Sequence, residues 1–328
     1  MEEVIKKSVI FAGYRCNNNC RFCMESEKRQ IPIRTTSEIK REITGARKRG
    51  ADYLEIIGGE AAIRPDIANI ISFARDLGFS TIMMATNGRV FAYPELAEKV
   101  VNAGLNSLVF SIHGPDAETH DFLTRTPGSF DQLCVGINNV REAAKKNDTR
   151  LHIGSNTCIV KSNFKKLPEI GKLIRSFEIE SSEFIFVDCN EGGAANDFNE
   201  LVPKISEAAP YIRECLEIGK RDNCIHWHIR YVPLCYFPDN LSQISEIMED
   251  KVFHTEHIAQ DFLNFDAQES RKNVGRAKTE KCSGCALYDY CEGIWVSYLK
   301  HFGDGEFQPV KEMTKEMKIA LESCDIIL

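Results

Sequence analysis

The sequence predicts an α/β protein whose main part is a partial (β/α)6 barrel, followed by a small C-terminal Cys-rich domain. Short apolar, β-branched runs alternate with amphipathic helical patterns through the first two-thirds of the 328 residues. The apolar runs show no strict polar–apolar alternation, which is typical of parallel strands covered on both faces. After about residue 190 this alternation of strand and helix patterns ends, and loops rich in cysteine dominate.

Each element of the barrel follows from these two patterns. Strands are predicted at residues 7–14, 52–58, 80–86, 106–112, 151–160 and 182–188. Helical patterns separate them at residues 36–50, 66–78, 93–104, 129–146 and 165–177. Six units are visible rather than eight, and right-handed crossovers curl such a sheet, so we expect an incomplete barrel. Chemistry in folds of this kind gathers at the C-terminal ends of the strands.

The C-terminal part starts after a further helical stretch. Residues 188–197 are loop-like, residues 198–220 are helical, and residues 224–234 indicate a strand that Pro233 interrupts. We place a boundary near residue 221. The barrel is then expected in residues 1–220 and the Cys-rich domain in residues 221–328.

Composition excludes several classes of protein. The net charge is −7 and no segment concentrates Lys and Arg, which argues against a nucleic-acid-binding face. No apolar run reaches membrane-spanning length, and the N-terminus lacks the pattern of a signal peptide. We therefore expect a cytoplasmic protein. Thirteen cysteines in a reducing compartment indicate metal binding or catalysis rather than a disulfide framework.

Three of these cysteines, Cys16, Cys20 and Cys23, lie within eight residues in a long loop, 15–35, after the first strand. A structural zinc site normally has four protein ligands, and zinc is the alternative interpretation. Four cysteines would saturate a 4Fe–4S cluster. Three leave one iron open, so that a small molecule can bind it and receive an electron directly.

The spacing C-x3-C-x2-C after the first strand of a β/α barrel resembles the signature of radical S-adenosylmethionine (radical SAM) enzymes. The segment "IIGGEAAIRPD" is similar to the family's second-strand motif, and "MATNGRV" and "LVFSIHGPDAETHDFLTRTPGSFDQ" resemble its third and fourth strand regions. The resemblance covers residues 8–190. It departs at Ala61-Ala62, where many relatives have proline after the Gly-Gly-Glu.

This resemblance implies a 4Fe–4S cluster held by Cys16, Cys20 and Cys23, with S-adenosylmethionine (SAM) on the open iron. Gly58, Gly59 and Glu60 would present backbone groups to the methionine ammonium, while Ser111 and His113 would reach the ribose and methionyl part. Arg125 is expected at the cofactor carboxylate, Asn156 at the ribose, and Phe22 beside the adenine or the cluster. The residues expected at the cofactor are Phe22, Gly58, Gly59, Glu60, Asn87, Ser111, His113, Arg125 and Asn156. The alternatives are a simple turn for the glycines, a core residue for His113 and a surface ion pair for Arg125.

A second group of cysteines resembles the C-terminal auxiliary-cluster domains of radical SAM enzymes, the SPASM and twitch types. Cys282, Cys285 and Cys291 are spaced C-x2-C-x5-C, and their number suits one auxiliary 4Fe–4S cluster. Cys235 is the expected fourth ligand, with Cys189 and Cys224 as competitors. Without a fourth protein ligand, an open iron could bind substrate. A structural zinc is the alternative for this group as well.

The resemblance implies reductive cleavage of SAM to a 5′-deoxyadenosyl radical that abstracts hydrogen from a small-molecule or peptide substrate. The auxiliary cluster would then assist electron transfer in oxidation, bond formation or epimerisation. In epimerisation a thiol returns hydrogen, and Cys189, at the end of the sixth strand, is the candidate catalytic residue; an inert buried thiol is the alternative. Cys158 is expected to be an ordinary buried residue.

Two further expectations concern binding partners. His226, His228 and Arg230 share one strand face and could bind a carboxylate or phosphate in the lumen, with surface exposure as the alternative. Because the barrel starts near residue 8, without a leader-binding domain ahead of it, we expect a small-molecule substrate, or a peptide bound through a separate protein. An electron donor such as flavodoxin or ferredoxin is implied. The competing class is a non-enzymatic iron–sulfur electron carrier or redox sensor.

Overall fold

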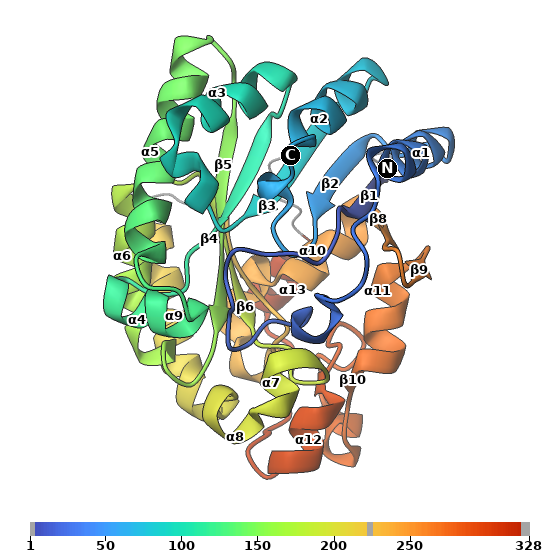
Figure 1. The fold of residues 1–328 in the computed structure, drawn as a ribbon. Helices are drawn as coiled ribbons and strands as arrows, with labels where there is room; N and C mark the ends of the chain where they lie inside the picture. The colour runs from blue at the N-terminus through green and yellow to red at the C-terminus, as the bar shows by residue number, and fades with distance from the viewer. Residues whose placement is uncertain (1–3, 222–225, 323–328) are drawn as a thin grey trace.

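The structure is a computed structural model that describes residues 4–221 and 226–322 (Figure 1). Its main sheet is formed by β1 (Ile5–Phe11), β2 (Tyr53–Ile57), β3 (Thr81–Thr86), β4 (Ser107–Ser111), β5 (His152–Ile159), β6 (Ser181–Phe186), β7 (Trp227–Arg230), β8 (Phe253–Ile258) and β9 (Leu263–Asn264). The strand order is β7-β6-β5-β4-β3-β2-β1-β8-β9. β1 to β8 pair in parallel and β9 is antiparallel. The predicted α/β fold with a partial barrel is therefore confirmed.

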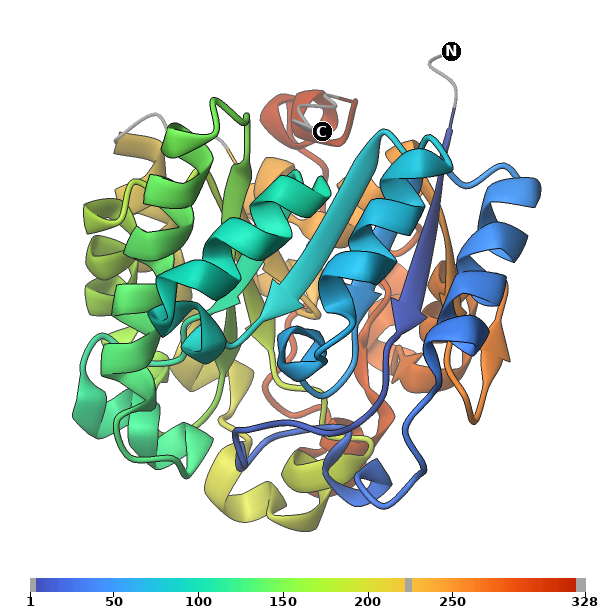
Figure 2. The same cartoon turned by 45° about the horizontal axis from the view of Figure 1, so that its top comes forward.

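Helices cover the outer face of this sheet (Figure 2). They are α1 (Thr36–Lys48), α2 (Ile67–Asp76), α3 (Pro94–Ala103), α4 (Ala117–Thr124), α5 (Ser129–Lys146), α6 (Leu167–Ser176) and α9 (Ile205–Arg221), with α7 (Gly192–Asn196) and α8 (Phe198–Leu201) at the end of β6. The sequence explains α1 well. Thr35 and Glu38 form a capping box, and Ile39 and Ile43 are fully buried against the strands.

The C-terminal part contains short elements. These are η5 (Leu234–Tyr236), η6 (Pro238–Gln243), α10 (Ser245–Val252), α11 (Ala267–Ser270), η7 (Arg271–Gly275), β10 (Arg276–Ala277), η8 (Glu280–Gly284), β11 (Ile294–Trp295), α12 (Val296–Phe302) and α13 (Lys315–Glu322). β7 and β8 extend the main sheet at its two ends, so the expected boundary at residue 221 does not coincide with an edge of the sheet. α10 contacts both β7 and β8 and lies where the barrel is open.

β8 is a strand that the sequence analysis missed. Its sequence, FHTEHI, is largely polar, because one of its faces lines the barrel lumen rather than an apolar core. The loop after β1 and the helices α7 and α8 lie at the same end of the barrel, the C-terminal end of the strands (Figure 2). Within the described residues no helix combines the length and apolarity needed to cross a membrane.

Candidate radical SAM site and auxiliary cysteine site

The loop between β1 and α1 brings Cys16, Cys20 and Cys23 together at the C-terminal end of the strands. All three thiols are half-buried and form no disulfide. Burial, followed by the neighbouring Cys16 and Cys23, raises the pKa of the Cys20 thiol to about 12. A metal would therefore be needed to keep the Cys20 thiol ionised, because ligation deprotonates a coordinating thiol outright.

Two glycines that directly follow β2 allow this loop to lie against the barrel. Gly59 N donates to Gly13 O at 2.8 Å, and Glu60 N donates to Arg15 O at 2.8 Å. A Cβ on Gly58 would lie 2.1 Å from Gly13 O, and one on Gly59 would lie 2.2 Å from Arg15 O. Gly58 also has a φ of +137°, which side chains rarely adopt. The glycines are therefore required by close backbone approach.

We expect Gly59→Ala to displace the cysteine loop, because its Cβ would overlap a backbone oxygen that cannot rotate away. The expected cost is about 1–3 kcal/mol of stability, the usual range for overpacking. Iron content after anaerobic reconstitution should fall by about four per chain, the content of one cluster. Gly305→Ala is the matched control, since nothing lies within 4 Å of a Cβ at that position. Equal iron content in the two variants would contradict this account.

A second glycine pair, Gly192-Gly193 in α7, holds the other side of the loop. Gly193 N donates to Cys23 O at 2.9 Å, and a Cβ on Gly193 would lie 2.0 Å from Arg21 O. The sequence analysis treated this segment as a plain loop. The adjacent glycines were the signal that could have identified it.

The Glu60 side chain is engaged within the protein. Its carboxylate accepts from Thr86 Oγ1 at 2.8 Å, from Asn87 N at 2.6 Å and from Ala62 N at 3.1 Å. Burial raises the pKa of this carboxyl, and the three hydrogen bonds partly offset the increase. Glu60 therefore links the end of β2 to the turn after β3, and because its N–H donates to Arg15 O, its backbone carbonyl is the part that remains for a cofactor.

Asn87 supports the loop from the turn after β3. Its Nδ2 donates to Asn17 Oδ1 at 2.6 Å and lies 3.7 Å from Cys16 Sγ. Arg89 donates to Asn17 O and, at 2.9 Å, to Asn18 Oδ1. Asn18 N lies 3.3 Å from Cys16 Sγ, a backbone donor of the kind that tunes an iron–sulfur centre.

His113 follows β4 and is buried and neutral. Burial, with a smaller contribution from His120, lowers the pKa of His113 to about 3. Its Nδ1 accepts from Cys158 N at 3.2 Å, so in the neutral ring the proton is on Nε2. The edge of the Phe22 ring meets the His113 ring with centroids 4.8 Å apart. Phe22 and His113 are thus together beside the cysteine loop.

This burial predicts a pH-dependent stability. The folded-state pKa of His113 lies below its ordinary value, so the unfolded chain binds the proton first as pH falls. Stability should be complete above about pH 6.5 and should decrease toward pH 3, by up to about 1.4 kcal/mol per pH unit for this one group. The pKa of His120, lowered to about 4 by burial, acts in the same direction.

The measurement is thermal unfolding, under anaerobic conditions, between pH 7.5 and pH 5.5. His113→Gln should show a weaker dependence of the unfolding midpoint on pH than the wild type. An identical dependence in both proteins would show that His113 is protonated equally in the folded and unfolded states.

The other residues expected at the cofactor, Ser111, Asn156 and Arg125, are more exposed than Glu60 and His113. Ser111 and Asn156 are register partners on β4 and β5 and are both half-buried. Arg125 is exposed at the end of α4, with a φ of +50°. Its contact with a cofactor carboxylate stays a prediction.

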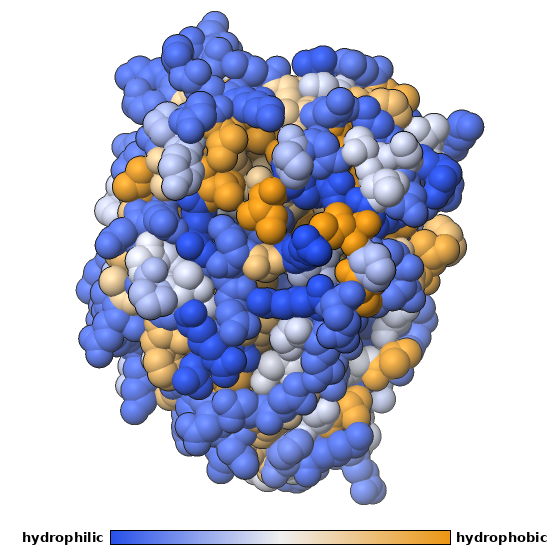
Figure 3. All heavy atoms as spheres, viewed as in Figure 1, coloured by the Kyte–Doolittle hydropathy of each residue, from blue (hydrophilic) through white to orange (hydrophobic). Residues whose placement is uncertain are grey.

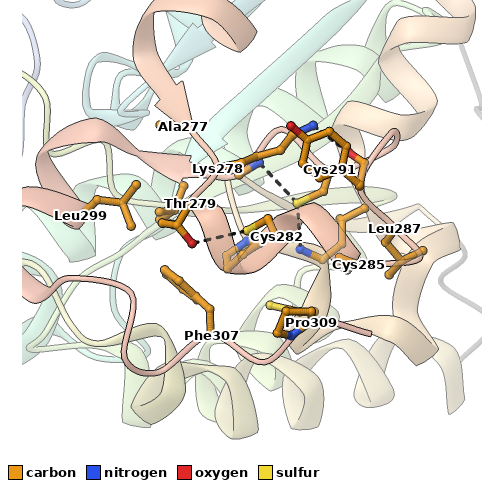
Figure 4. A pocket seen from close by; sticks show the side chains of 16 residues that line it. Ala277, Lys278, Thr279, Cys282, Cys285, Leu287, Cys291, Leu299, Phe307 and Pro309 are labelled. Carbon is orange, nitrogen blue, oxygen red and sulfur yellow. Dashed lines mark hydrogen bonds between the residues drawn. The ribbon is translucent and has the colours of Figure 1, made fainter. Parts of the chain in front are cut away.

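The second cysteine group gathers around one small cavity in the C-terminal part (Figure 4). The sulfur-bearing residues that line it are Cys235, Cys282, Cys285 and Cys291. Cys235 is therefore the cysteine that the fold brings to the other three. Of its competitors, Cys189 lies in the core, and Cys224 lies outside the described residues.

The surroundings of this cavity are apolar, with backbone donors at one sulfur. Leu234, Leu287 and Phe307 are among its walls. Gly293 N lies 3.3 Å and Leu234 N 3.5 Å from Cys291 Sγ. Burial first, and then the neighbouring thiols, raises the pKa of Cys235 to about 12. Soft sulfur donors in an apolar pocket fit an iron–sulfur cluster or zinc.

Neither cysteine group has the compact arrangement of a mononuclear site. In residues 4–221 and 226–322, no group of three or more His, Cys, Asp or Glu side chains is arranged to hold a metal ion. Three thiols in the loop and four in the C-terminal part are donor sets that suit iron–sulfur clusters, and the set of four also suits zinc.

A cavity of about 770 Å³ opens between the cysteine loop and the C-terminal part. Most of the charges on its walls are paired. Lys7 Nζ lies 3.0 Å from Glu55 Oε2, and Arg230 Nη2 lies 3.0 Å from Glu249 Oε2. Asp188 also lines it, and burial raises the pKa of this carboxyl to about 6.

The strand face of His226, His228 and Arg230 does point into the lumen, where all three line a smaller cavity. Arg230 is half-buried and contacts Glu183 at 3.2 Å as well as Glu249. Its charge is therefore already balanced, which argues against the predicted carboxylate or phosphate site.

Cys189 and Cys158, the two thiols near the C-terminal end of the strands, both lie where they were not expected. Cys189 is fully buried in the apolar core and does not line the large cavity, which argues against a role as hydrogen donor. Cys158, expected to be an ordinary buried residue, is partly exposed on β5. Its pKa is raised well above the usual value by burial first, and then by Cys20, Asp188 and Cys23, so it lies beside the cysteine loop.

Comparison with known proteins identifies the class to which this fold and loop belong. Residues 10–174 match the family model of the radical SAM superfamily, and the chain is a member of that superfamily. It is 34% identical over 162 residues to the AdoMet-dependent heme synthase of Methanosarcina barkeri, covering 49% of this chain and 44% of that protein. It is 29% identical over 172 residues to the GTP 3′,8-cyclase of Marinobacter nauticus, covering 51% and 50%. The alignments span about half the length of these relatives.

Solved structures share the fold over nearly the whole chain. SuiB of Streptococcus suis bound to S-adenosylmethionine has a TM-score of 0.65 at 15% identity and covers 93% of this chain and 76% of that one. anSMEcpe with bound AdoMet and a peptide has a TM-score of 0.62 at 12% identity and covers 96% and 95%. The likeness to both includes the C-terminal part that holds the second cysteine group.

Proposed function

We propose that the protein is a radical SAM enzyme with a 4Fe–4S cluster at Cys16, Cys20 and Cys23. When bound, the cluster supplies the electron that splits SAM into methionine and a 5′-deoxyadenosyl radical, which abstracts hydrogen from the substrate. The observation that carries the proposal is the three-cysteine loop seated on the Gly58-Gly59 backbone at the C-terminal end of the barrel. Family membership supports it.

The chain's own residues orient the cofactor and exclude water. The backbone at Gly58, Gly59 and Glu60 would receive the methionine ammonium. Neutral His113 offers an Nε2–H donor without a charge. The Phe22 ring, packed on His113, covers one side of the site. Because most of the lumen charges are paired, the radical would meet a substrate in a cavity with few mobile polar groups.

A second 4Fe–4S cluster is proposed at Cys235, Cys282, Cys285 and Cys291. The convergence of four thiols on one apolar cavity supports it. Four protein ligands leave no iron open, so this cluster would transfer electrons rather than bind substrate. Oxidation or bond formation is thus favoured over epimerisation, because Cys189 is buried away from the cavity.

The substrate is proposed to be a small molecule or a peptide. A cavity of about 770 Å³ is within the range of small-molecule sites and would also admit a side chain of a peptide. Two structural neighbours carry peptides in their crystals, SuiB with its precursor peptide SuiA and anSMEcpe with Cp18Cys.

The test of the proposed function is SAM cleavage by the anaerobically reconstituted protein. After reduction with dithionite, we expect 5′-deoxyadenosine and methionine to form in equal amounts. A non-enzymatic electron carrier would be reduced but would leave SAM intact. The absence of 5′-deoxyadenosine, including with candidate substrates, would overturn the proposal.

Removal of the auxiliary ligands separates the two clusters. Cys285→Ala combined with Cys282→Ala should lower iron from about eight to about four per chain. SAM cleavage should persist, because the loop cluster is untouched. Stoichiometric zinc in the wild type, or unchanged iron in the variant, would exclude the second cluster. Iron and zinc are measured by elemental analysis.

A further inference from the structure

Asp188 lies where the large cavity meets the cysteine loop. It follows β6, at the C-terminal end of the strands, and lines the cavity of about 770 Å³ together with Met24, the residue after Cys23. Its charge acts on the Cys158 thiol, as do the charges of the loop thiols Cys20 and Cys23. The Asp188 carboxyl is therefore close to the place where the proposed radical would form.

The chain holds this carboxylate in position but provides no cation beside it. Its Oδ1 accepts from Asn190 N at 2.8 Å, and no described residue forms an ion pair with it. The cation that acts on it from further away is Arg276, which is already paired with Glu246 and Glu292. Burial raises the pKa of Asp188 to about 6, because a half-buried carboxylate without a counter-charge is costly to ionise.

The other charges on the walls of this cavity are paired or solvated. The lining residues that carry them are Lys7, Glu55, Glu191, Arg230, Glu249, Arg271 and Lys300. Lys7 is paired with Glu55 at 3.0 Å. Glu191 and Lys300 are both exposed, so water screens their opposite charges. His257 also lines the cavity, and burial keeps it neutral by lowering its pKa.

The two arginines have no positive charge to spare for Asp188. Both contact Glu249, Arg230 at 3.0 Å and Arg271 at 3.1 Å. Each also has a second carboxylate behind the wall, at 3.2 Å from Arg230 and at 2.7 Å from Arg271. Two cations are thus opposed by three carboxylates. A charge withdrawn from water needs a partner of opposite sign, and since no described residue supplies one to Asp188, the ligand is the remaining source.

The surroundings suit a water-soluble ligand with a charged head and an apolar body. Figure 3 shows mostly hydrophilic residues over α7, α8 and α12, at the lower end of the molecule. Inside the cavity, the rings of Tyr231 and Trp295 meet with centroids 4.7 Å apart and form an aromatic wall. Such a wall offers apolar contact to the part of a ligand that carries no charge.

We propose that Asp188 is a substrate-binding residue and that the substrate carries an ammonium or another cationic group, which pairs with this carboxylate. The inference rests on the proposed function, because it names the substrate class of that same cavity. The hydrogen bond from Asn190 N orients the carboxylate, and its other oxygen is left for the cation. A charge-assisted hydrogen bond of this kind would position the substrate beside the cysteine loop.

The experiment is calorimetric titration of the anaerobically reconstituted holoenzyme with benzylamine and with benzyl alcohol at about pH 7.5. The two probes have nearly the same size, and only benzylamine is a cation. We expect the wild type to bind benzylamine about tenfold more tightly than the alcohol. Asp188→Asn removes the charge but keeps the size of the side chain, so it should weaken benzylamine about tenfold and leave benzyl alcohol within about twofold. Asp76→Asn, at an exposed site on α2, is the matched control and should match the wild type with both probes.

Three outcomes would overturn this assignment. One is equal binding of the two probes by the wild type, or no binding of either. Another is an unchanged affinity for benzylamine in Asp188→Asn, or an equal loss of both probes. The third is the same loss of benzylamine in Glu191→Gln, which would assign the effect to the general field of the cavity. Binding is measured without SAM cleavage, so missing 5′-deoxyadenosine with the expected probe binding would sink the proposed function and leave the cation site in place.

Discussion

Replacing Cys20 with alanine is expected to abolish SAM cleavage and to lower iron by about four per chain, leaving the auxiliary site loaded. Cys20 is the middle ligand of the loop in sequence, and its half-buried thiol neighbours those of Cys16 and Cys23. Two thiols cannot replace the three that the open-iron arrangement requires. No other Cys in the loop offers a substitute ligand, since residues 12–35 contain only these three.

The measurement is iron content together with 5′-deoxyadenosine formation after anaerobic reconstitution. Cys134→Ala is the matched control, since Cys134 is on α5, remote from both cysteine groups in sequence and element. It should retain both iron and SAM cleavage. If Cys20→Ala kept its full iron content and its turnover, the loop would not be the ligand set.

The second large effect is expected from Arg276→Met. Arg276 is 4% exposed and its guanidinium lies 2.6 Å from Glu246 and 3.3 Å from Glu292. It also donates to Val232 O at 3.2 Å and to Gly293 O. Removing the cation leaves buried Glu246 without its ion-pair partner, while Glu292 keeps Arg271 at 2.7 Å, and a stranded buried charge of this kind costs about 3–5 kcal/mol. Since Gly293 is two residues from Cys291, the auxiliary iron should be lost as well.

Thermal unfolding and iron analysis check this prediction. Arg150→Met, at an exposed position, removes the same charge and should leave the unfolding midpoint within about 1 °C, as most surface substitutions do. Adding Glu246→Gln to Arg276→Met should recover part of the stability, because it removes the stranded charge. A midpoint for Arg276→Met equal to that of Arg150→Met would show that the network is not stabilising.

Much of the barrel was predictable because its strands are apolar runs between helices with clear hydrophobic faces. Ile39 and Ile43 are an example, since one helical turn separates them and both are buried. The cysteine spacing likewise placed Cys16, Cys20 and Cys23 in the loop after β1. The strands, the helices and the position of the cysteine loop are all encoded in local sequence patterns, so they could be predicted from the sequence alone.

Features that depend on tertiary placement were not predictable. The sequence of β8 is largely polar, because residues of this strand line a charged lumen. Cys158 lies on the same face of β5 as Asn156, which lines the lumen, whereas Cys189, after the end of β6, enters the core, and sequence does not distinguish these two placements. Cys235 lies 47 residues from Cys282 in sequence, and only the folded chain selects it over its competitors.

The most direct test uses electron paramagnetic resonance on a variant with Cys282, Cys285 and Cys291 all changed to alanine, so that only the loop cluster remains. After reduction, the signal should shift when SAM is added, because the cofactor binds the iron that lacks a cysteine. A signal that stays the same with and without SAM would mean that no iron is open to the cofactor, and the account would fail.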